Sequence, residues 1–448
     1  ETVYTEETGI ELDTGSLKNG VDFGVAPFGK TEGSVEGDLV FISYGIVADS
    51  IKRNDLEGLN LSGKIAVMME GPPKNIPKKA WDEQEATMFY LVNAVRSGAK
   101  ALIYIDNGRE KDPPSLMADY FSRRQIALES ESENGGAPVP IIYMTQEGAK
   151  KLFAKSPVPM DTAKANAESN SFKGFALGLK AKIKMKRSSS KGTARNVAGY
   201  FEGSDPKLKA EAVLFSAHYD AYGKDNGKIY NGAADNALGT AEMLAVAEAF
   251  SKMDPKPKRS LVFLAVTGEE YGLYGSKYWA KNPTWDIKQV AGNLNLDGIG
   301  SEVYGPVKVM VGYGAEYSTL GKNLDDVAKA MGISVMPDPM PDEKVFLRSD
   351  HYSFVERGVP ALMLLGGPEG SKDSLVERIK AWEKVHYHQP SDDVMEGWDW
   401  SGAQTVAQVM GIIGLRVANE NEMPSWLPNT RFGKLKRGNT KSLPKEED

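Results

Sequence analysis

The stretch that decides the fold is Ala217-His218-Tyr219-Asp220, followed by Asn231-Gly232-Ala233-Ala234-Asp235-Asn236. An apolar run at residues 212–215 precedes it and predicts a buried strand, and a glycine-containing turn and a helix start come after it. In α/β folds, ligands bind in the crevice at the carboxyl ends of the strands. A histidine and two carboxylates at such a place therefore predict a metal site in an α/β fold.

The composition is that of a globular protein with more than one domain. A chain of 448 residues is too long for one simple core. The hydrophobic fraction of 41% and the charged fraction of 26% are ordinary for a globular protein. A net charge of -7 argues against nucleic acid as the main partner. No stretch approaches the roughly 18 apolar residues of a membrane-spanning helix, so we expect no membrane span.

Cysteine is absent from the chain, which excludes thiolate zinc sites, cysteine nucleophiles and disulfides. Any imidazole ligand must come from the four histidines, His218, His351, His386 and His388. Metal binding, if present, therefore depends on histidine, aspartate and glutamate side chains.

The first part of the chain alternates short apolar runs with helical patterns. Strands are predicted at residues 39–46, 63–69, 101–105 and 139–144, and helices at 86–96 and 145–153. This block has no histidine and no cluster of ligand-type residues, which favours a structural or substrate-shielding domain at 38–165. Residues 1–37 are polar and rich in glycine, and we expect them to pack on a later domain.

A polar segment separates the two halves of the sequence. Residues 155–177 are rich in small and polar side chains and predict a linker. Residues 179–186 then alternate lysine with apolar residues, which predicts a half-exposed strand whose lysines discourage pairing at a sheet edge.

From residue 196 onward, strand and helix patterns alternate. Strands are predicted at 196–201, 212–216, 260–266, 290–296, 307–311 and 361–365, and helices at 235–250, 271–280, 318–331, 350–356 and 400–417. This alternation predicts an α/β fold with a mostly parallel central sheet between layers of helices. We assign residues 166–430 to this domain and residues 431–448 to a C-terminal tail.

Ligand-type residues recur where the predicted strands of this domain end: His218 and Asp220, Asp235, Glu269 and Glu270, Asp297, and His388. In a parallel sheet, successive strand ends line one crevice, so these groups can converge. Two histidines and three carboxylates suit zinc or a similar divalent ion, and a carboxylate between two ions can bridge them.

Each of these residues also has a structural interpretation. Asp235 fits a helix N-cap, Glu269 and Glu270 fit an acidic first helical turn, and Asp297 fits a turn with the glycine that follows it. Taken alone, His218 fits a structural role as well as it fits a role as metal ligand. The joint pattern favours a metal site, because all the candidates fall at strand ends or loops of one domain.

Five motifs in this order carry a family resemblance: His218-Tyr-Asp220, Asn231-Gly-Ala-Ala-Asp235-Asn236-Ala-Leu-Gly239, Gly268-Glu-Glu270, Asn295-Leu-Asp297 and Tyr387-His388-Gln-Pro-Ser-Asp392. With them, residues 196–393 resemble the catalytic domain of the dizinc aminopeptidases of metallopeptidase clan MH. Residues 38–165 resemble, by pattern alone, the protease-associated (PA) domain that is often inserted in these enzymes.

The resemblance implies a role for each matching residue. Asp235 would bridge two zinc ions, with His218 and Asp297 on one ion and Glu270 and His388 on the other. Glu269 would be the general base, Tyr387 would stabilise the oxyanion, and Asp220 would orient the His218 imidazole. Five further residues are candidates to lie next to the bound substrate: Arg348, Asp350, His351, Gly366 and Gly367. For His351 a structural role is favoured over a ligand role, and Gly366 and Gly367 fit a turn equally well.

The resemblance implies a zinc-dependent exopeptidase, with an aminopeptidase as the leading prediction and peptides as its substrates. A carboxypeptidase of the same clan is an alternative, and it would need a cation such as Arg348 for the terminal carboxylate of the substrate. A glutaminyl cyclase-like acyltransferase with one zinc ion and a non-catalytic receptor-like homologue are further alternatives. Because the chain begins with Glu1 and the family is often exported, we expect a secreted or periplasmic protein.

Overall fold

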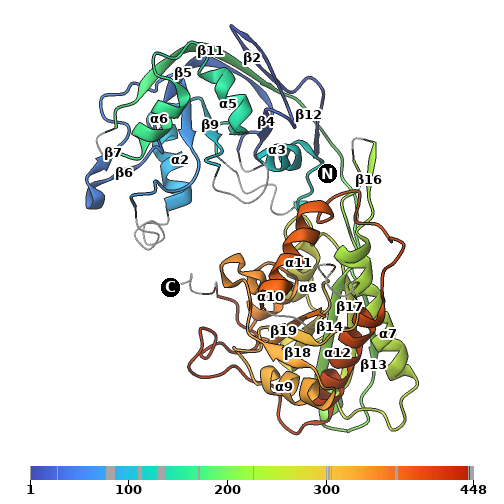
Figure 1. Ribbon diagram of the computed structural model, residues 1–448. Coiled ribbons are helices and arrows are strands. Elements are labelled where there is room, and N and C mark those ends of the chain that lie inside the picture. The colour runs from blue at the N-terminus through green and yellow to red at the C-terminus, as the bar shows by residue number, and fades with distance from the viewer. Residues whose placement is uncertain are drawn as a thin grey trace. The chain divides into compact units, whose positions relative to one another are not determined.

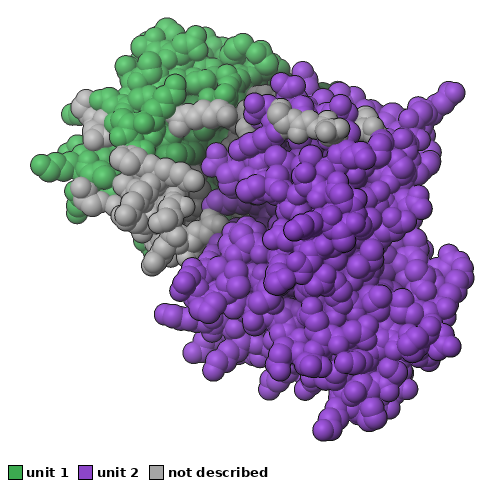
Figure 2. Space-filling view, turned by 60° about the horizontal axis from the view of Figure 1, so that its bottom comes forward, with its two compact units in different colours: residues 1–192, 448 green, residues 193–447 purple. Residues whose placement is uncertain are grey.

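The computed structural model describes residues 2–27, 29–76, 86–108, 114–129, 137–169, 172–225, 227–298, 300, 303, 305–368, 372–441 and 443. The chain divides into two compact units, which comprise residues 1–192 with 448 and residues 193–447. Figure 1 labels their helices and strands where there is room, and Figure 2 colours the first unit green and the second purple. Each unit has its own sheet and is described by itself.

Unit 1 is built on an eight-stranded sheet with four parallel strands in succession. Its order is β3 (Gly15–Lys18), β2 (Gly9–Leu12), β11 (Phe175–Met185), β5 (Gly33–Phe41), β8 (Ile65–Met69), β9 (Ala101–Ile105), β10 (Ile141–Met144) and β4 (Phe23–Val25). Strands β5, β8, β9 and β10 run parallel. The α-helices in the described part of this unit are α2 (Ala86–Arg96), α3 (Pro114–Ser122), α5 (Gln146–Leu152) and α6 (Met160–Ala167).

The structure differs from the predicted boundaries in the first half of the chain. Residues 1–37 were expected to pack on a later domain, but β2 pairs with β11 and β4 pairs with β10, so these strands belong to the sheet of unit 1. The predicted boundary at residue 165 falls before β11, which is an integral strand of the same sheet. Backbone pairing therefore moves the end of unit 1 to residue 192.

The segment predicted as a linker also contains regular structure, since α6 and the start of β11 lie within residues 155–177. Strand β11 has the predicted alternation of exposed lysines and buried apolar residues. It is not an edge strand, however, because β2 and β5 flank it on both sides. The lysines thus lie on the solvent-exposed face of an interior strand and do not protect a sheet edge.

Unit 2 contains a mixed seven-stranded sheet. Its order is β13 (Val197–Phe201), β17 (Ser260–Val266), β14 (Ala212–His218), β18 (Val290–Asn295), β21 (Ala361–Gly367), β19 (Val309–Tyr313) and β20 (Ser334–Met336). The four strands from β17 to β21 in this order are parallel. Strand β13 pairs antiparallel with β17, and β19 pairs antiparallel with β21. The α/β class with a mostly parallel centre is confirmed.

Helices cover both faces of this sheet because β14 is apolar on both sides. Val213 and Phe215 of β14 join a core formed with α7 (Gly239–Ser251), α9 (Leu320–Ala330) and α12 (Ser401–Asn419). The alternate residues Ala212 and Leu214 join a second core with α8 (Tyr274–Lys281) and α10 (His351–Val355). Side chains of a strand alternate between its faces, so an uninterrupted apolar strand requires a helical layer on each side.

Strand β20, helix α11 (Lys372–Val385) and a hairpin of β15 (Gly223–Asp225) and β16 (Lys228–Tyr230) in unit 2 were not predicted. The hairpin lies between the first two motifs of the sequence, and α11 leads into the last one. None of the helices in the described part of the chain has the length and apolar character that crossing a bilayer requires.

Candidate metal centre

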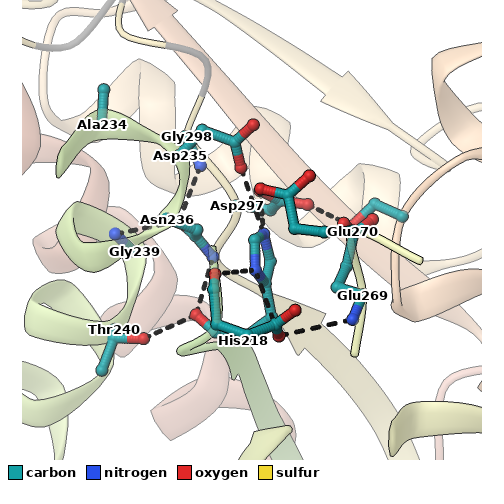
Figure 3. A network of polar contacts seen from close by, with 12 residues as sticks. His218, Ala234, Asp235, Asn236, Gly239, Thr240, Glu269, Glu270, Asp297 and Gly298 are labelled. Atoms are coloured by element: carbon teal, nitrogen blue, oxygen red, sulfur yellow. Dashed lines mark hydrogen bonds and ion pairs between the residues drawn. The ribbon is translucent and has the colours of Figure 1, made fainter. Parts of the chain in front are cut away.

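Two groups of three ligand-type residues lie at the carboxyl ends of the central strands, and they share Asp235. In each group the candidate ligand atoms are within 4.8 Å of one another: His218, Asp235 and Asp297 in the first, and Asp235, Glu270 and His388 in the second. The structure thus brings together all five predicted metal ligands, which come from segments up to 170 residues apart. Figure 3 shows four of them: His218, Asp235, Glu270 and Asp297.

The order of the strands explains this convergence. His218 is the last residue of β14, Glu270 follows the end of β17, and Asp297 follows the end of β18. Strand β14 lies between β17 and β18 and is parallel to both, so the three side chains emerge at one edge of the sheet. Asp235 lies in the turn before α7.

The distances within the two groups suit a tetrahedral ion. His218 Nε2 is 3.2 Å from Asp235 Oδ1 and 3.3 Å from Asp297 Oδ1. His388 Nε2 is 3.4 Å from Asp235 Oδ2 and 3.0 Å from Glu270 Oε2. Tetrahedral zinc with bonds of about 2.0–2.1 Å places neighbouring ligand atoms about 3.3 Å apart. Asp235 offers one oxygen to each group, as a bridging carboxylate would.

Asp235 is held by backbone hydrogen bonds that fix the turn around it. The backbone at Asp235 and Asn236 departs from helical geometry. The Asp392 carboxylate accepts hydrogen bonds from the amides of Ala234 at 2.8 Å and Asp235 at 3.1 Å, and the Asp392 carbonyl accepts one from Ala233 at 3.2 Å. Asp392 is buried and lies four residues after His388, so it connects the loops that carry Asp235 and His388.

Asn236 connects the same turn to the first group. Its amide donates to the carbonyls of Leu296, at 2.9 Å, and His218, at 3.4 Å. Its side-chain oxygen accepts from the amides of Gly239 and Gly298 at 3.1 and 3.2 Å (Figure 3). One buried amide side chain therefore joins the segments that follow β14 and β18 to the start of α7.

A buried hydrogen-bond chain leads to the second oxygen of Asp297. Ser349 donates to Asp297 Oδ2, and the Asn295 side chain donates to Ser349 at 2.8 Å. Ser216 in turn donates to Asn295 Oδ1 at 2.6 Å, and Asn293 donates to Ser216 at 2.9 Å. Because Oδ2 accepts from Ser349, Oδ1 remains directed at His218, which orients Asp297 as a ligand.

The electrostatics of the histidines agree with a cation site. Burial alone would lower the pKa of His218, but the carboxylates of Asp297, Glu269 and Asp235 raise it well above its usual value. Burial also opposes the charge of His388, yet Glu270 and Asp235 raise its pKa to about 9. The carboxylates therefore stabilise positive charge at both imidazoles, and metal ions would supply that charge in place of protons.

Glu269 and Tyr387 lie beside the two groups without belonging to either. Burial raises the pKa of Glu269 well above its usual value, and Asp297, Asp350 and Glu270 add to this effect while His218 opposes it. The Tyr387 ring stacks on the His388 ring, with centroids 3.6 Å apart. Burial and the neighbouring carboxylates raise the pKa of Tyr387, so its hydroxyl keeps its proton and remains a hydrogen-bond donor.

Asp220 faces the His218 imidazole mainly through its backbone carbonyl. The His218 Nδ1 atom lies 3.2 Å from the backbone carbonyl of Asp220 and 3.8 Å from its carboxylate. The Asp220 carboxylate instead accepts from the Glu269 amide at 3.3 Å. The residue does face the imidazole, but its carbonyl makes the closer contact and its carboxylate positions Glu269.

The five residues predicted near the substrate take different places. Arg348 is exposed, and its charge lowers the pKa of Tyr387. Asp350 and His351 are fully buried, and His351 packs on Phe346 with ring centroids 4.9 Å apart. Gly366 and Gly367 are not in a turn, because both pair with β19 within strand β21. A Cβ atom at Gly366 would lie 2.5 Å from Val307, so close packing requires glycine there.

The other histidine near the site, His386, is in neither ligand group. Its Nδ1 contacts the Ser391 carbonyl at 2.9 Å, and its ring lies against Trp382. His351 is also outside both groups, as the sequence favoured. Tyr222 was not predicted: its hydroxyl lies 3.3 Å from His388 Nδ1, and its position in the Asp220–Gly223 segment gave no indication of this contact.

Comparison with known proteins agrees with this site. Residues 196–412 match the family model described as "Peptidase family M28". A glutamate carboxypeptidase 2 homolog from Caenorhabditis elegans is 27% identical over 277 residues, which are 54% of this chain and 35% of that protein. The chain thus spans about a third of the length of this curated relative.

Solved structures share the fold. The structure superimposes on an aminopeptidase from Aneurinibacillus sp. strain AM-1 with a TM-score of 0.61 and 21% identity, covering 94% of this chain and 83% of that chain. For a zinc aminopeptidase from Bacillus subtilis the TM-score is 0.56 and the identity 17%, covering 97% and 87%. The match to the family model covers every predicted ligand and confirms the resemblance to clan MH. Residues 196–412, just under half of the chain, thus match peptidase family M28.

Proposed function

We propose that this peptidase is a two-zinc aminopeptidase, which removes N-terminal residues from peptides. The observation that carries the proposal is the shared carboxylate: Asp235 directs Oδ1 at His218 and Oδ2 at His388, at distances that tetrahedral zinc requires. His218 and Asp297 complete the protein ligands of one ion, and Glu270 and His388 those of the other.

The residues around the ligands fit peptide hydrolysis. When bound by these five residues, zinc ions would supply an activated water and polarise the scissile carbonyl. Glu269, beside both ligand groups, would accept a proton from the attacking water and deliver it to the departing amine nitrogen. The Tyr387 hydroxyl donates a hydrogen bond to the oxyanion of the tetrahedral intermediate. The Asp220 carboxylate holds the Glu269 backbone in place for this transfer.

One carboxylate beside the site favours the N-terminus of the substrate over its C-terminus. Two zinc ions would offset the charges of the proposed ligands Glu270 and Asp297, whereas Glu269 lies outside both ligand groups and would attract a protonated α-amino group and repel a terminal carboxylate. The fold shared with two solved aminopeptidases supports the same choice.

Substrates blocked at either end test the proposal. Leucyl and other aminoacyl chromogenic substrates, and a tripeptide in free, N-acetylated and C-amidated forms, are to be compared with and without a chelator. We expect hydrolysis of the free and C-amidated peptides, none of the N-acetylated one, and loss of activity on chelation that zinc restores. Equal cleavage of the N-acetylated peptide would contradict the aminopeptidase assignment.

A carboxypeptidase of the same family is the second candidate. Arg348 supports it, because this exposed cation lies close enough to Tyr387 to influence its pKa and could bind a terminal carboxylate. The curated relative from Caenorhabditis elegans, named as a glutamate carboxypeptidase homolog, points the same way. In that case C-amidation would abolish hydrolysis, N-acetylation would not, and Arg348→Gln would raise KM more than it lowers kcat.

A further inference from the structure

Tyr222 makes contact with two of the residues proposed as ligands of the same ion. Its hydroxyl lies 3.3 Å from His388 Nδ1 and 3.5 Å from the backbone carbonyl of Glu270. The Tyr222 side chain is buried, and its ring meets the His388 ring edge to face, with centroids 4.9 Å apart. Packing and hydrogen bonding thus act on the same imidazole.

The position of this tyrosine is fixed by neighbouring aromatic rings. Tyr271 and Tyr230 pack against Tyr222 at centroid distances of 5.5 and 6.1 Å, both near perpendicular. Tyr230 ends strand β16 of the hairpin, and Tyr271 follows Glu270 directly. Since a buried ring between such neighbours has few alternative rotamers, the hydroxyl is held where it meets Nδ1.

Only one direction of hydrogen bonding is consistent with metal binding by His388. For Nε2 to offer its lone pair to a metal, Nδ1 must carry the proton, and Nδ1–H must then donate to the Tyr222 oxygen. The Tyr222 hydroxyl proton is in turn directed at the Glu270 carbonyl. The Glu270 carbonyl, the hydroxyl and the imidazole therefore form one directed chain that ends at Nε2.

We propose that Tyr222 is a positioning residue of the second metal site, which holds His388 in the Nδ1–H tautomer and aims Nε2 at Asp235 and Glu270. This inference rests on the proposed role of His388 as a ligand. A backbone φ of 56° at His388 places this residue in a region that side chains other than glycine adopt rarely, so its conformation depends on such outside contacts. The first site uses a different device, because the Asp220 carbonyl contacts His218 Nδ1.

The test compares Tyr222→Phe with Tyr219→Phe in the full chain. Tyr222→Phe keeps the ring and removes only the hydroxyl. Tyr219 is a matched control in the same loop, since its hydroxyl donates to the Arg195 carbonyl and touches no proposed ligand. Zinc titration against a chelating indicator gives the two affinities. We expect Tyr222→Phe to lower the affinity for one zinc ion by about 10- to 100-fold and to leave the affinity for the other unchanged. In Tyr219→Phe we expect both affinities to be unchanged.

The tautomer gives a second measurement that a purely structural role would not change. With four histidines in the chain, long-range ¹H–¹⁵N spectra of the zinc-loaded protein can resolve the His388 ring, with His386→Gln helping assignment. We expect a protonated, slowly exchanging Nδ1 in the wild type and a shifted or exchange-broadened one in Tyr222→Phe. If Tyr222→Phe binds both zinc ions with the affinities of the wild type and its His388 spectrum is unchanged, the inference is overturned while the proposed function stays intact. A wild type that binds one zinc ion would instead refute both.

Discussion

Glu269 and Glu270 are neighbours in sequence, but Glu269 is the proposed general base and Glu270 is a proposed metal ligand. Glu270 belongs to a ligand group, whereas Glu269 stands beside both groups and is backed by Asp220. We predict that Glu269→Gln keeps both zinc ions and lowers kcat by about 10²- to 10⁴-fold, because it removes only the proton transfer. Glu270→Gln is the matched control and should lose zinc. Metal analysis and kcat are measured together, and a near-normal kcat for Glu269→Gln would show that another group is the base.

His351 gives the protein a pH dependence that is separate from the metal ligands. Burial lowers the pKa of His351 from 6.5 to about 4. A histidine with a lower pKa in the folded state disfavours folding once the unfolded chain is protonated, so stability is complete above pH 6.5 and falls as the pH drops towards 4. The loss is about 3 kcal/mol, because each pKa unit corresponds to about 1.4 kcal/mol.

Unfolding of the metal-free protein by denaturant between pH 7.5 and 4 measures this loss. We predict that His351→Gln has a shallower fall of the free energy of unfolding than the wild type. His386→Gln serves as the control, since the His386 imidazole is near the surface and bonds to a backbone carbonyl. Identical pH slopes for wild type and His351→Gln would contradict the prediction.

At the scale of single residues, the sequence was sufficient for groups that stand in a motif at a strand end, such as His218 and Asp297. It was insufficient for groups that act through a long-range hydrogen bond. Tyr222 reaches His388 across 166 positions, and Asp392 reaches Ala234 across 158. Asp220 was predicted to orient the imidazole, but no sequence pattern shows that its carbonyl lies nearer to the ring than its carboxylate does.

At the scale of elements, the turn before α7 depends on one side chain. Asp392 accepts two hydrogen bonds from consecutive amides, and this carboxylate is buried. Asp392→Asn would direct an amide N–H at one of these donors, so we predict a loss of about 1–3 kcal/mol in the free energy of unfolding. We also expect weaker zinc binding, because Asp235 lies in the turn.

Asp393→Asn is the control for this prediction. Asp393 is the next residue, is exposed, and among the described residues accepts only from the Val394 amide at 2.8 Å. Denaturant unfolding and zinc titration of both variants are required. If Asp392→Asn is as stable as Asp393→Asn and binds zinc equally well, the turn does not depend on this carboxylate.

The elements themselves were predictable where the periodic pattern is strong. The helix at residues 86–96 matches α2, and the strand at 260–266 matches β17. Strand β11 shows the limit, because its alternation predicts one exposed face but cannot tell an edge from the interior of a sheet. Helix α11 was missed, although Leu375, Ile379 and Trp382 form an apolar stripe at helical spacing.

At the scale of the whole molecule, the two units have separate hydrophobic cores. One core cluster is confined to residues 4–185, and the others to residues 212–432. All five proposed ligands lie in unit 2. A ligand stabilises only the unit whose folded state binds it, so zinc should act on the unfolding of unit 2 alone.

Scanning calorimetry with zinc and with a chelator tests this separation. We predict two transitions, one of which is unchanged by zinc. At a zinc concentration of about 1,000 times Kd, the free energy of unfolding of unit 2 rises by about 4 kcal/mol. For a unit of this size, that raises the Tm of the other transition by roughly 10 °C. Tyr219→Phe should behave as the wild type, whereas Glu270→Gln should lose the shift and keep the zinc-independent transition. A single transition that moves as a whole with zinc would contradict independent unfolding, because the two cores would then melt as one.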